Sequence, residues 1–334
     1  MANSDINART PASNLISPVA LLRDQVIRLD AAVLICRAIP RKEPVHTLRK
    51  TTRTMEAQLA LLQQIPGLPR HEAEADKVRR RLKSVRKAAG AVRDFDVQRK
   101  LVKDDAPAKD AADTTDAAVA TKDGSVDDRL RQDAKALSKH LKRQRRKETG
   151  KLTQVLRSEE KRLAKALRKL EAALKDAEQH TVPSTQLAES IERWFQHNTP
   201  HLAARSRNHG NGEEANGDHA NRLRAVERLD EESLHTLRKA SKLCRYMAES
   251  LPEGFPTAQH LTERFEQIQR SGGQWHDWLL LERIAAKRAG TRAALTTRYS
   301  QHRDAALAEY QARLAELLPT RQRHTAKPTL TAAA

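Results

Sequence analysis

The same nine-residue pattern occurs once in each half of this chain, at residues 45–53 and again at residues 234–242. On an α-helix, residues three, four and seven positions apart share a face. Each copy therefore carries a row of cationic and imidazole side chains on one face: His46, Arg49, Lys50 and Arg53 in the first copy, and His235, Arg238, Lys239 and Lys242 in the second. Apolar residues fall on the opposite face. We expect each helix to bury its apolar face, and the repeated row suggests one long anionic partner held between two related surfaces.

The composition favours helices throughout. Glycine accounts for only 11 of the 334 residues, and Ala, Leu, Arg, Glu and Lys dominate, as is typical of a nearly all-helical protein. We find no convincing alternating pattern of the kind that strands show. The sequence predicts an all-α fold made of two antiparallel helical bundles that are related by an internal duplication.

Changes in composition suggest where the two bundles begin and end. We expect a first bundle over residues 18–182, with Ser17 as the helix cap and Pro18 in the first turn, and a second bundle over residues 183–318. An Asp- and Ala-rich insert at residues 104–126 has little apolar content and is predicted to be flexible. Residues 1–17 and 319–334 are predicted to be disordered tails.

A second pair of related segments follows the two predicted helices that carry the cationic rows. Residues 90–96 and residues 273–278 both contain a glycine, then a basic or imidazole residue, an aspartate and an aromatic residue. Because glycine permits a break in a helix, we expect an interruption near Gly90 and another at Gly272 and Gly273. The aspartates Asp94 and Asp277 would then lie near a new amino-terminal helical turn, where negative charge is favoured.

The net charge of +19 points to polyanionic partners. Aromatic residues make up only 3% of the chain, which argues against a surface that stacks exposed bases. No uninterrupted apolar stretch is long enough to cross a bilayer, so we expect no membrane partner. The amino-terminal segment is polar and lacks the apolar core of a signal peptide, which predicts a cytoplasmic protein.

These paired elements resemble the CHAD family, a histidine-containing helical domain that binds inorganic polyphosphate. The resemblance covers roughly residues 18–317. The second copy matches the family pattern H-x-x-R-x-x-x-K-x-x-R-Y and the glycine and His-Asp element that follows it, through His235, Arg238, Lys242, Arg245, Tyr246, Gly273, His276 and Asp277. The first copy matches through His46, Arg49, Arg53, Gly90, Arg93, Asp94 and Asp96.

This chain departs from the family pattern at four positions. Thr54 and Glu56 stand where the family's first copy is commonly basic, and Lys50 and Lys239 stand where the family usually has an aliphatic residue. The first cationic row is therefore expected to be weaker at its far end.

The resemblance implies a non-enzymatic protein that binds polyphosphate in a basic groove between the two bundles, in association with polyphosphate granules. No cofactor and no metal ion are expected. Lys83 and Arg86 belong to a basic run that could extend the binding row. The candidate polyphosphate-binding residues are His46, Arg49, Lys50, Arg53, Lys83, Arg86, Arg93, His235, Arg238, Lys239, Lys242, Arg245, Tyr246 and His276.

Several alternatives stay open on sequence grounds. The main one is a helical protein that binds nucleic acids without sequence preference, because DNA and RNA backbones offer similar charges. The dense basic run at residues 142–147 is equally consistent with a solvated helix face and with a second anion-binding patch. No Gly-rich phosphate loop, nucleophile–base set or carboxylate cluster indicates catalysis. The adjacent pair His276 and Asp277 lacks partners that would complete a metal site.

Overall fold

The computed structural model describes residues 15–107, 122–199, 215–252 and 255–317. Within these ranges the chain is helical apart from turns and two short strands, which confirms the all-α prediction. The helices are α1 (Pro18–Ala38), α2 (Lys42–Leu62), α3 (Glu72–Asp104), α4 (Lys122–Ala173), α5 (Ser184–Asn198), α7 (Ala215–Glu227), α8 (Glu231–Glu249), α9 (Pro256–Ala289) and α10 (Ala294–Leu317), and a single 3₁₀ turn spans Lys175–Ala177.

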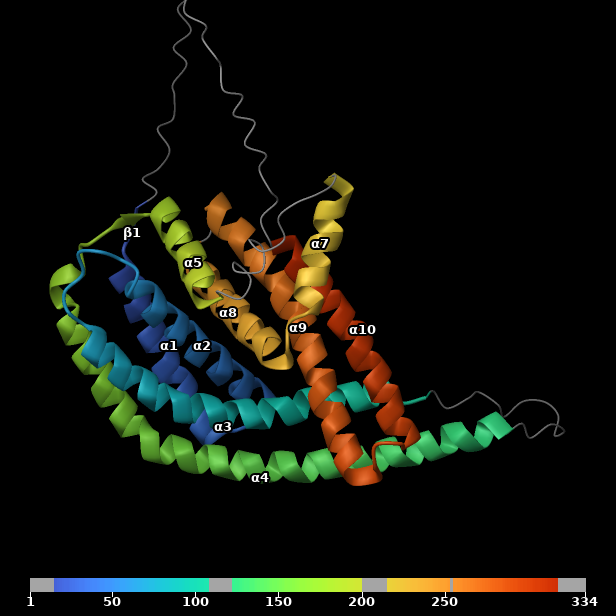
Figure 1. Cartoon of the computed structure of the whole chain (residues 1–334). Coiled ribbons are helices and arrows are strands. Elements are labelled where there is room, and N and C mark those ends of the chain that lie inside the picture. The colour runs from blue at the N-terminus through green and yellow to red at the C-terminus, as the bar shows by residue number, and fades with distance from the viewer. Residues whose placement is uncertain (1–14, 108–121, 200–214, 253–254, 318–334) are drawn as a thin grey trace, which may run out of the picture.

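Helices α1 to α4 pack against one another (Figure 1). The predicted start of α1 is confirmed, because the Ser17 hydroxyl accepts a hydrogen bond from the Ala20 amide and Pro18 occupies the first turn. Helix α3 lies alongside α4, the longest helix at 52 residues, over much of its length. Helix α2 packs between α1 and α3, which leaves it one further side for other contacts.

Helices α5 and α7 to α10 form the second group (Figure 1). Asp230 caps the amino-terminal end of α8, because its carboxylate accepts a hydrogen bond from the Ser233 amide at 2.8 Å. Helix α9 packs along both α8 and α10. Helix α8, which carries the second cationic row, is therefore capped at its start and packed along its length against α9.

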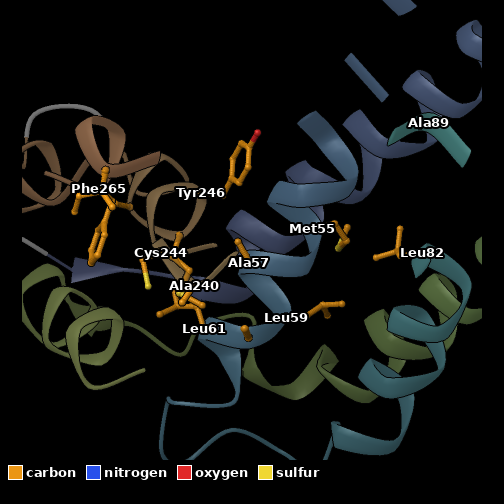
Figure 2. Packing of buried hydrophobic residues seen from close by; sticks show 14 of the residues in the cluster. Met55, Ala57, Leu59, Leu61, Leu82, Ala89, Ala240, Cys244, Tyr246 and Phe265 are labelled. Carbon is orange, nitrogen blue, oxygen red and sulfur yellow. The ribbon is translucent and has the colours of Figure 1, made fainter. Parts of the chain in front are cut away.

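The two groups meet where α2 packs against α8. Figure 2 shows Met55 and Leu59 on the side of α2 towards α3, and Ala57 and Leu61 on the side towards Cys244 of α8. The buried apolar residues of both groups form one continuous cluster from Ile16 to Ala315. The division into two bundles and their relation by an internal duplication stay predictions.

The predicted helix breaks at the glycines are wrong. Helices α3 and α9 run without interruption through Gly90 and through Gly272 and Gly273, and positive φ angles among the glycines occur only at Gly67 and Gly290 within the described residues. A glycine inside a helix costs only about 1 kcal/mol relative to alanine, which long flanking helical segments can offset. Asp94 and Asp277 accordingly lie in the middle of helices and not in a first turn.

Three predicted boundaries also change. Residues 15–17 of the predicted tail are ordered, because Leu15 and Ile16 pair antiparallel with Val182 and Pro183 as strands β1 and β2. The predicted insert at 104–126 is shorter, since α3 includes residue 104 and α4 begins at residue 122. A strand of two residues is too short to show an alternating pattern, so strands β1 and β2 could not be predicted from periodicity. Residues 1–14 and 319–334 of the predicted tails and residues 108–121 of the predicted insert lie outside the described residues.

Candidate functional site

A basic cavity of about 350 Å³ lies where α2, α3, α8 and α9 meet. Seven of its lining residues are Lys or Arg and two are aspartates, so the lining carries a clear excess of positive charge. The lining residues are Arg49 and Arg53 of α2, Arg86, Lys87, Gly90, Ala91 and Asp94 of α3, Arg238, Lys239 and Lys242 of α8, and His276 and Asp277 of α9. Both predicted cationic rows thus face one shared cavity.

On the side of α2 and α3, the cations have carboxylate partners. Arg49 lies 3.7 Å from the Asp94 carboxylate, and Arg53 lies 3.4 Å from the Glu56 carboxylate, which Arg86 also contacts. Burial, followed by the charge of Arg53, lowers the pKa of Arg86 to about 10. Glu56, which departs from the family pattern, therefore neutralises part of the first cationic row.

On the side of α8, the cations are more enclosed and less compensated. Burial lowers the pKa of Lys242 well below its usual range, and the charges of Arg49, Arg53 and Arg238 lower it further. Among the described residues no carboxylate lies within ion-pair distance of Lys242 or Arg238, and Asp277 is the carboxylate that acts on both at longer range. The buried Nε of Arg238 also has no hydrogen-bond partner in the described part of the protein.

Asp277 stands among these cations, and its carboxyl keeps its proton to a higher pH than an ordinary aspartate does. Burial raises its pKa to about 6, and the nearby Asp94 carboxylate acts in the same direction, although Arg238, Arg49 and Lys242 oppose them. The two aspartates of the repeated motif thus approach each other inside the cavity lining. A charged Asp277 would repel an anion bound there, whereas a protonated Asp277 would not.

His276 and His235 form a neutral aromatic wall beside the cations. Their rings lie 4.8 Å apart in a T-shaped arrangement, and the His235 ring lies 4.8 Å from that of Trp275. Burial and then Arg238 lower the pKa of His276 to about 3, and they also lower the pKa of His235. A neutral imidazole can still donate one hydrogen bond to an anion.

Packing behind this wall fixes its position. Trp275 stacks on Tyr310 with ring centroids 5.7 Å apart, and the Tyr310 hydroxyl donates to the Leu234 carbonyl in the first turn of α8. Gly272 makes room for that ring, because a Cβ at this position would lie 2.7 Å from the Tyr310 side chain. The glycine predicted to break α9 therefore serves close packing between helices.

Half of the candidate residues from the sequence line the cavity, and the other half lie outside its lining. Lys50, His46 and Lys83 are exposed, and Arg93 is half-buried close to His46. Arg245 lies 2.8 Å from the Glu249 carboxylate and donates to Gln269. The residues outside the lining are His46, Lys50, Lys83, Arg93, His235, Arg245 and Tyr246.

Lining residues that the candidate set omitted are Lys87, Gly90, Ala91, Asp94 and Asp277. Helical spacing could have found three of them, since Lys87, Gly90 and Asp94 follow Lys83 at intervals of four, three and four residues. The aspartates were visible in the repeated motif but had been assigned to helix starts. A continuous helix turns them towards the cations instead.

The basic run of α4 lies outside the cavity lining. In the basic run of α4, Arg145 points towards α3 and pairs with Asp96 at 2.6 Å, while Lys142, Arg143, Arg146 and Lys147 are exposed. Within the described ranges, no three His, Cys, Asp or Glu side chains gather as metal ligands would. None of the described helices is both long and apolar enough to pass through a bilayer.

Comparisons with known proteins agree on one family. The family model of the CHAD domain matches residues 20–286. Among solved structures, the chain is similar to the CHAD domain from the plant Ricinus communis, with a TM-score of 0.53 and 17% identity over 90% of this chain and 88% of the other. It is also similar to PptA from Streptomyces chartreusis, with a TM-score of 0.53 and 15% identity over 89% of this chain and 97% of the other. A search of curated proteins gives no match. Because the family model covers well over half of its length, this chain belongs to the CHAD domain family.

Proposed function

We propose that this protein binds inorganic polyphosphate in the cavity between α2, α3, α8 and α9, without acting on it chemically. The observation that carries the proposal is the concentration of seven Lys and Arg residues from three helices around one cavity. Lys242 and Arg238 are the strongest part of it, since both are desolvated and lack an ion-pair partner among the described residues. A phosphate chain would supply the missing negative charge.

The donor types suit phosphate oxygens. The guanidinium groups of Arg49 and Arg238 offer planar, multi-donor contacts, while Lys242 supplies a compact point charge. Phosphate groups in a chain have no base edges to read, so closely spaced cations are sufficient chemistry for recognising them. Each further phosphate can meet another cation, so long chains should bind more tightly than short ones.

Family membership supports the same ligand. The resemblance found in the sequence implies polyphosphate binding for the family as a whole, and here both motif copies contribute side chains to one cavity. Nothing in the described cavity lining pairs a nucleophile with a base, which favours binding over hydrolysis or phosphoryl transfer. Association with polyphosphate granules would follow directly from such binding.

Titration with labelled polyphosphate tests the site. The double variant Arg49→Ala/Arg238→Ala removes one guanidinium from each side of the cavity, and we expect its affinity to fall by about 100-fold or more. The control Arg157→Ala/Arg270→Ala removes the same charge from exposed positions of α4 and α9 outside the lining. The control should bind nearly as wild type. Unchanged affinity in a folded cavity variant would reject the site.

Competition separates this proposal from nucleic-acid binding. At physiological salt, RNA or DNA at equal phosphate concentration should fail to displace polyphosphate from the wild-type protein, because the lining has closely spaced cations and, apart from the His276 imidazole, no aromatic side chain on which bases could stack. Efficient displacement would favour the nucleic-acid alternative. Phosphate release with added divalent metal would instead favour an enzyme.

A further inference from the structure

The outer face of α1 is more apolar than packing within this chain requires. Of the large apolar side chains that are exposed among the described residues, four lie on α1 or directly after it: Ile27, Leu34, Ile35 and Ile39 are 68%, 50%, 55% and 50% exposed. The fifth, Leu15, lies just before the helix on β1. Surface helices normally turn a polar face to water, and the main exposed apolar patch of a protein is often functional.

Helical spacing gathers these side chains into one stripe. Ile27, Leu34 and Ile35 lie seven and eight residues apart and so share a face, and the exposed small residues Ala31 and Ala38 fall between and beside them. The opposite face of α1, with Leu22, Leu29 and Val33, is buried against the rest of the protein. Helix α1 is therefore apolar on both sides, and the described residues of the chain cover only one of them.

Cations of α4 lie beside this stripe. Arg37 of α1 pairs with Glu160 of α4, and Asp30 lies close enough to Arg168 and Glu160 for both charges to affect it. The two helices thus run side by side in opposite directions. On the exposed surface of this part of α4 stand five cations without an ion-pair partner among the described residues, and four of them share one face at helical spacing: Arg157, Lys161, Lys165 and Arg168. Asp24, near the amino-terminal end of the stripe, is an exposed carboxylate on the same side of α1.

We propose that the exposed face of α1, together with the cationic row of α4, docks onto an anionic lipid surface. An apolar stripe beside Lys and Arg side chains is the arrangement by which helices lie in the plane of a membrane interface, with the apolar side chains in the acyl region and the cations at the lipid phosphates. This departs from the expectation of no membrane partner, which considered only a spanning segment. The proposal does not depend on the ligand of the basic cavity.

A second copy of the chain fits this face less well. Helix α1 has 21 residues, so a stripe about 30 Å long and about 10 Å wide buries only about 300 Å² per partner, against about 800 Å² in a typical stable interface. Two copies would also bring their rows of α4 cations together, and like charges repel. An anionic surface removes both objections, because it is extended and opposite in charge.

Vesicle co-sedimentation tests the proposal with the full chain. We expect wild type to bind phosphatidylcholine vesicles that contain phosphatidylglycerol and not vesicles of phosphatidylcholine alone. The variant Ile27→Ser/Ile35→Ser should lose about tenfold or more in partitioning, because two exposed apolar side chains no longer enter the interface. The matched variant Ile27→Leu/Ile35→Leu keeps the apolar area and should bind as wild type. Both positions are exposed in the fold, so thermal unfolding should be unchanged.

A second set of variants separates this surface from the cavity. Arg157→Ser/Lys161→Ser should weaken binding to the anionic vesicles, while the cavity variant Arg49→Ala/Arg238→Ala should bind them as wild type. Failure of wild type to bind anionic vesicles, or full binding by the serine variant of α1, would overturn the proposal. So would a dimer in sedimentation analysis that the same serine variant abolishes, because the stripe would then serve self-association.

Discussion

Helices α2 and α8 carry related cationic rows into the same cavity, yet they hold their charges in different ways. On α2, Arg49 and Arg53 lie 3.7 Å and 3.4 Å from carboxylates of α3 and of α2 itself. On α8, Arg238 and Lys242 have no such partner among the described residues, although burial lowers the pKa of both, as it does for Arg53. The first row is largely compensated by carboxylates, and the second is not.

This difference has a physical cost and a physical use. A desolvated cation without a partner destabilises the fold, so the α8 row must be held in place by other contacts. Those contacts are visible behind it, where Tyr310 stacks on Trp275 and donates to the carbonyl of Leu234. We infer that α8 provides most of the attraction for phosphate. The arginines of α2 must first break their ion pairs with carboxylates before they can contact a phosphate group.

The largest expected contrast is between single arginine variants of the two rows. Arg238→Ala should weaken polyphosphate binding by about 10- to 100-fold, because it removes an uncompensated charge-assisted donor. Arg53→Ala should cost less than about fivefold, since Glu56 already neutralises part of that charge. Titration of both variants under the same salt conditions checks this. Equal losses of affinity in the two variants would show that the ion pairs of α2 do not weaken its contribution to polyphosphate binding.

Glycine substitutions sharpen the comparison at the level of packing. Gly272→Ala should lower the free energy of unfolding by about 1–3 kcal/mol, because its Cβ would lie 2.7 Å from the buried Tyr310 ring. Gly90→Ala should be neutral or should raise it by up to about 1 kcal/mol, since nothing lies within 4 Å of an added Cβ there. Chemical denaturation measures both. An unchanged free energy of unfolding in Gly272→Ala would mean that Tyr310 is not tightly packed against α9.

The variant Lys242→Met should separate stability from binding. Its amino group has a lower pKa in the folded protein than in the unfolded chain, so the unfolded state binds more protons and stability is lost as the pH falls below the ordinary lysine range. Methionine removes this penalty and should raise the free energy of unfolding at neutral pH by about 1 kcal/mol. Polyphosphate affinity should fall in the same variant. A destabilised variant would contradict the view of Lys242 as an uncompensated cation.

The smallest expected effect concerns the pH dependence of binding. The pKa of Asp277 is raised to about 6, above its value in the unfolded chain, so its contribution to stability is complete at low pH and is lost as the pH rises through about 6. Over the same range its negative charge appears beside the bound anion. At pH 8, Asp277→Asn should bind polyphosphate about fivefold more tightly than wild type, and at pH 5 the two should bind alike. A constant ratio across this range would exclude the role of Asp277.

The sequence predicted the helical class and the faces of the two cationic helices, because both depend on local periodicity. Arg49, Arg53, Arg238 and Lys242 all line the cavity as helical spacing indicated. His46 and Lys50 share a face with Arg49 by the same spacing, yet they lie outside the lining. Periodicity gives the direction of a side chain relative to its own helix but not which parts of the neighbouring helices it meets.

Interactions between distant segments account for what the sequence did not reveal. Gly272 looked like a helix breaker because its partner, Tyr310, lies far away in the sequence. Asp94 and Asp277 looked like residues of helix starts, and only the packing of α3 and α9 brings them together. The exposed stripe of α1 was hidden because the helix is apolar on its buried side as well.

A crystal structure with a short phosphate oligomer tests the central claim most directly. Phosphate groups should occupy the cavity, in contact with Arg238 and Lys242 of α8 and with Arg49 of α2. Phosphates bound instead along the exposed cations of α4, with the cavity free of ligand, would contradict the shared site of the two cationic rows.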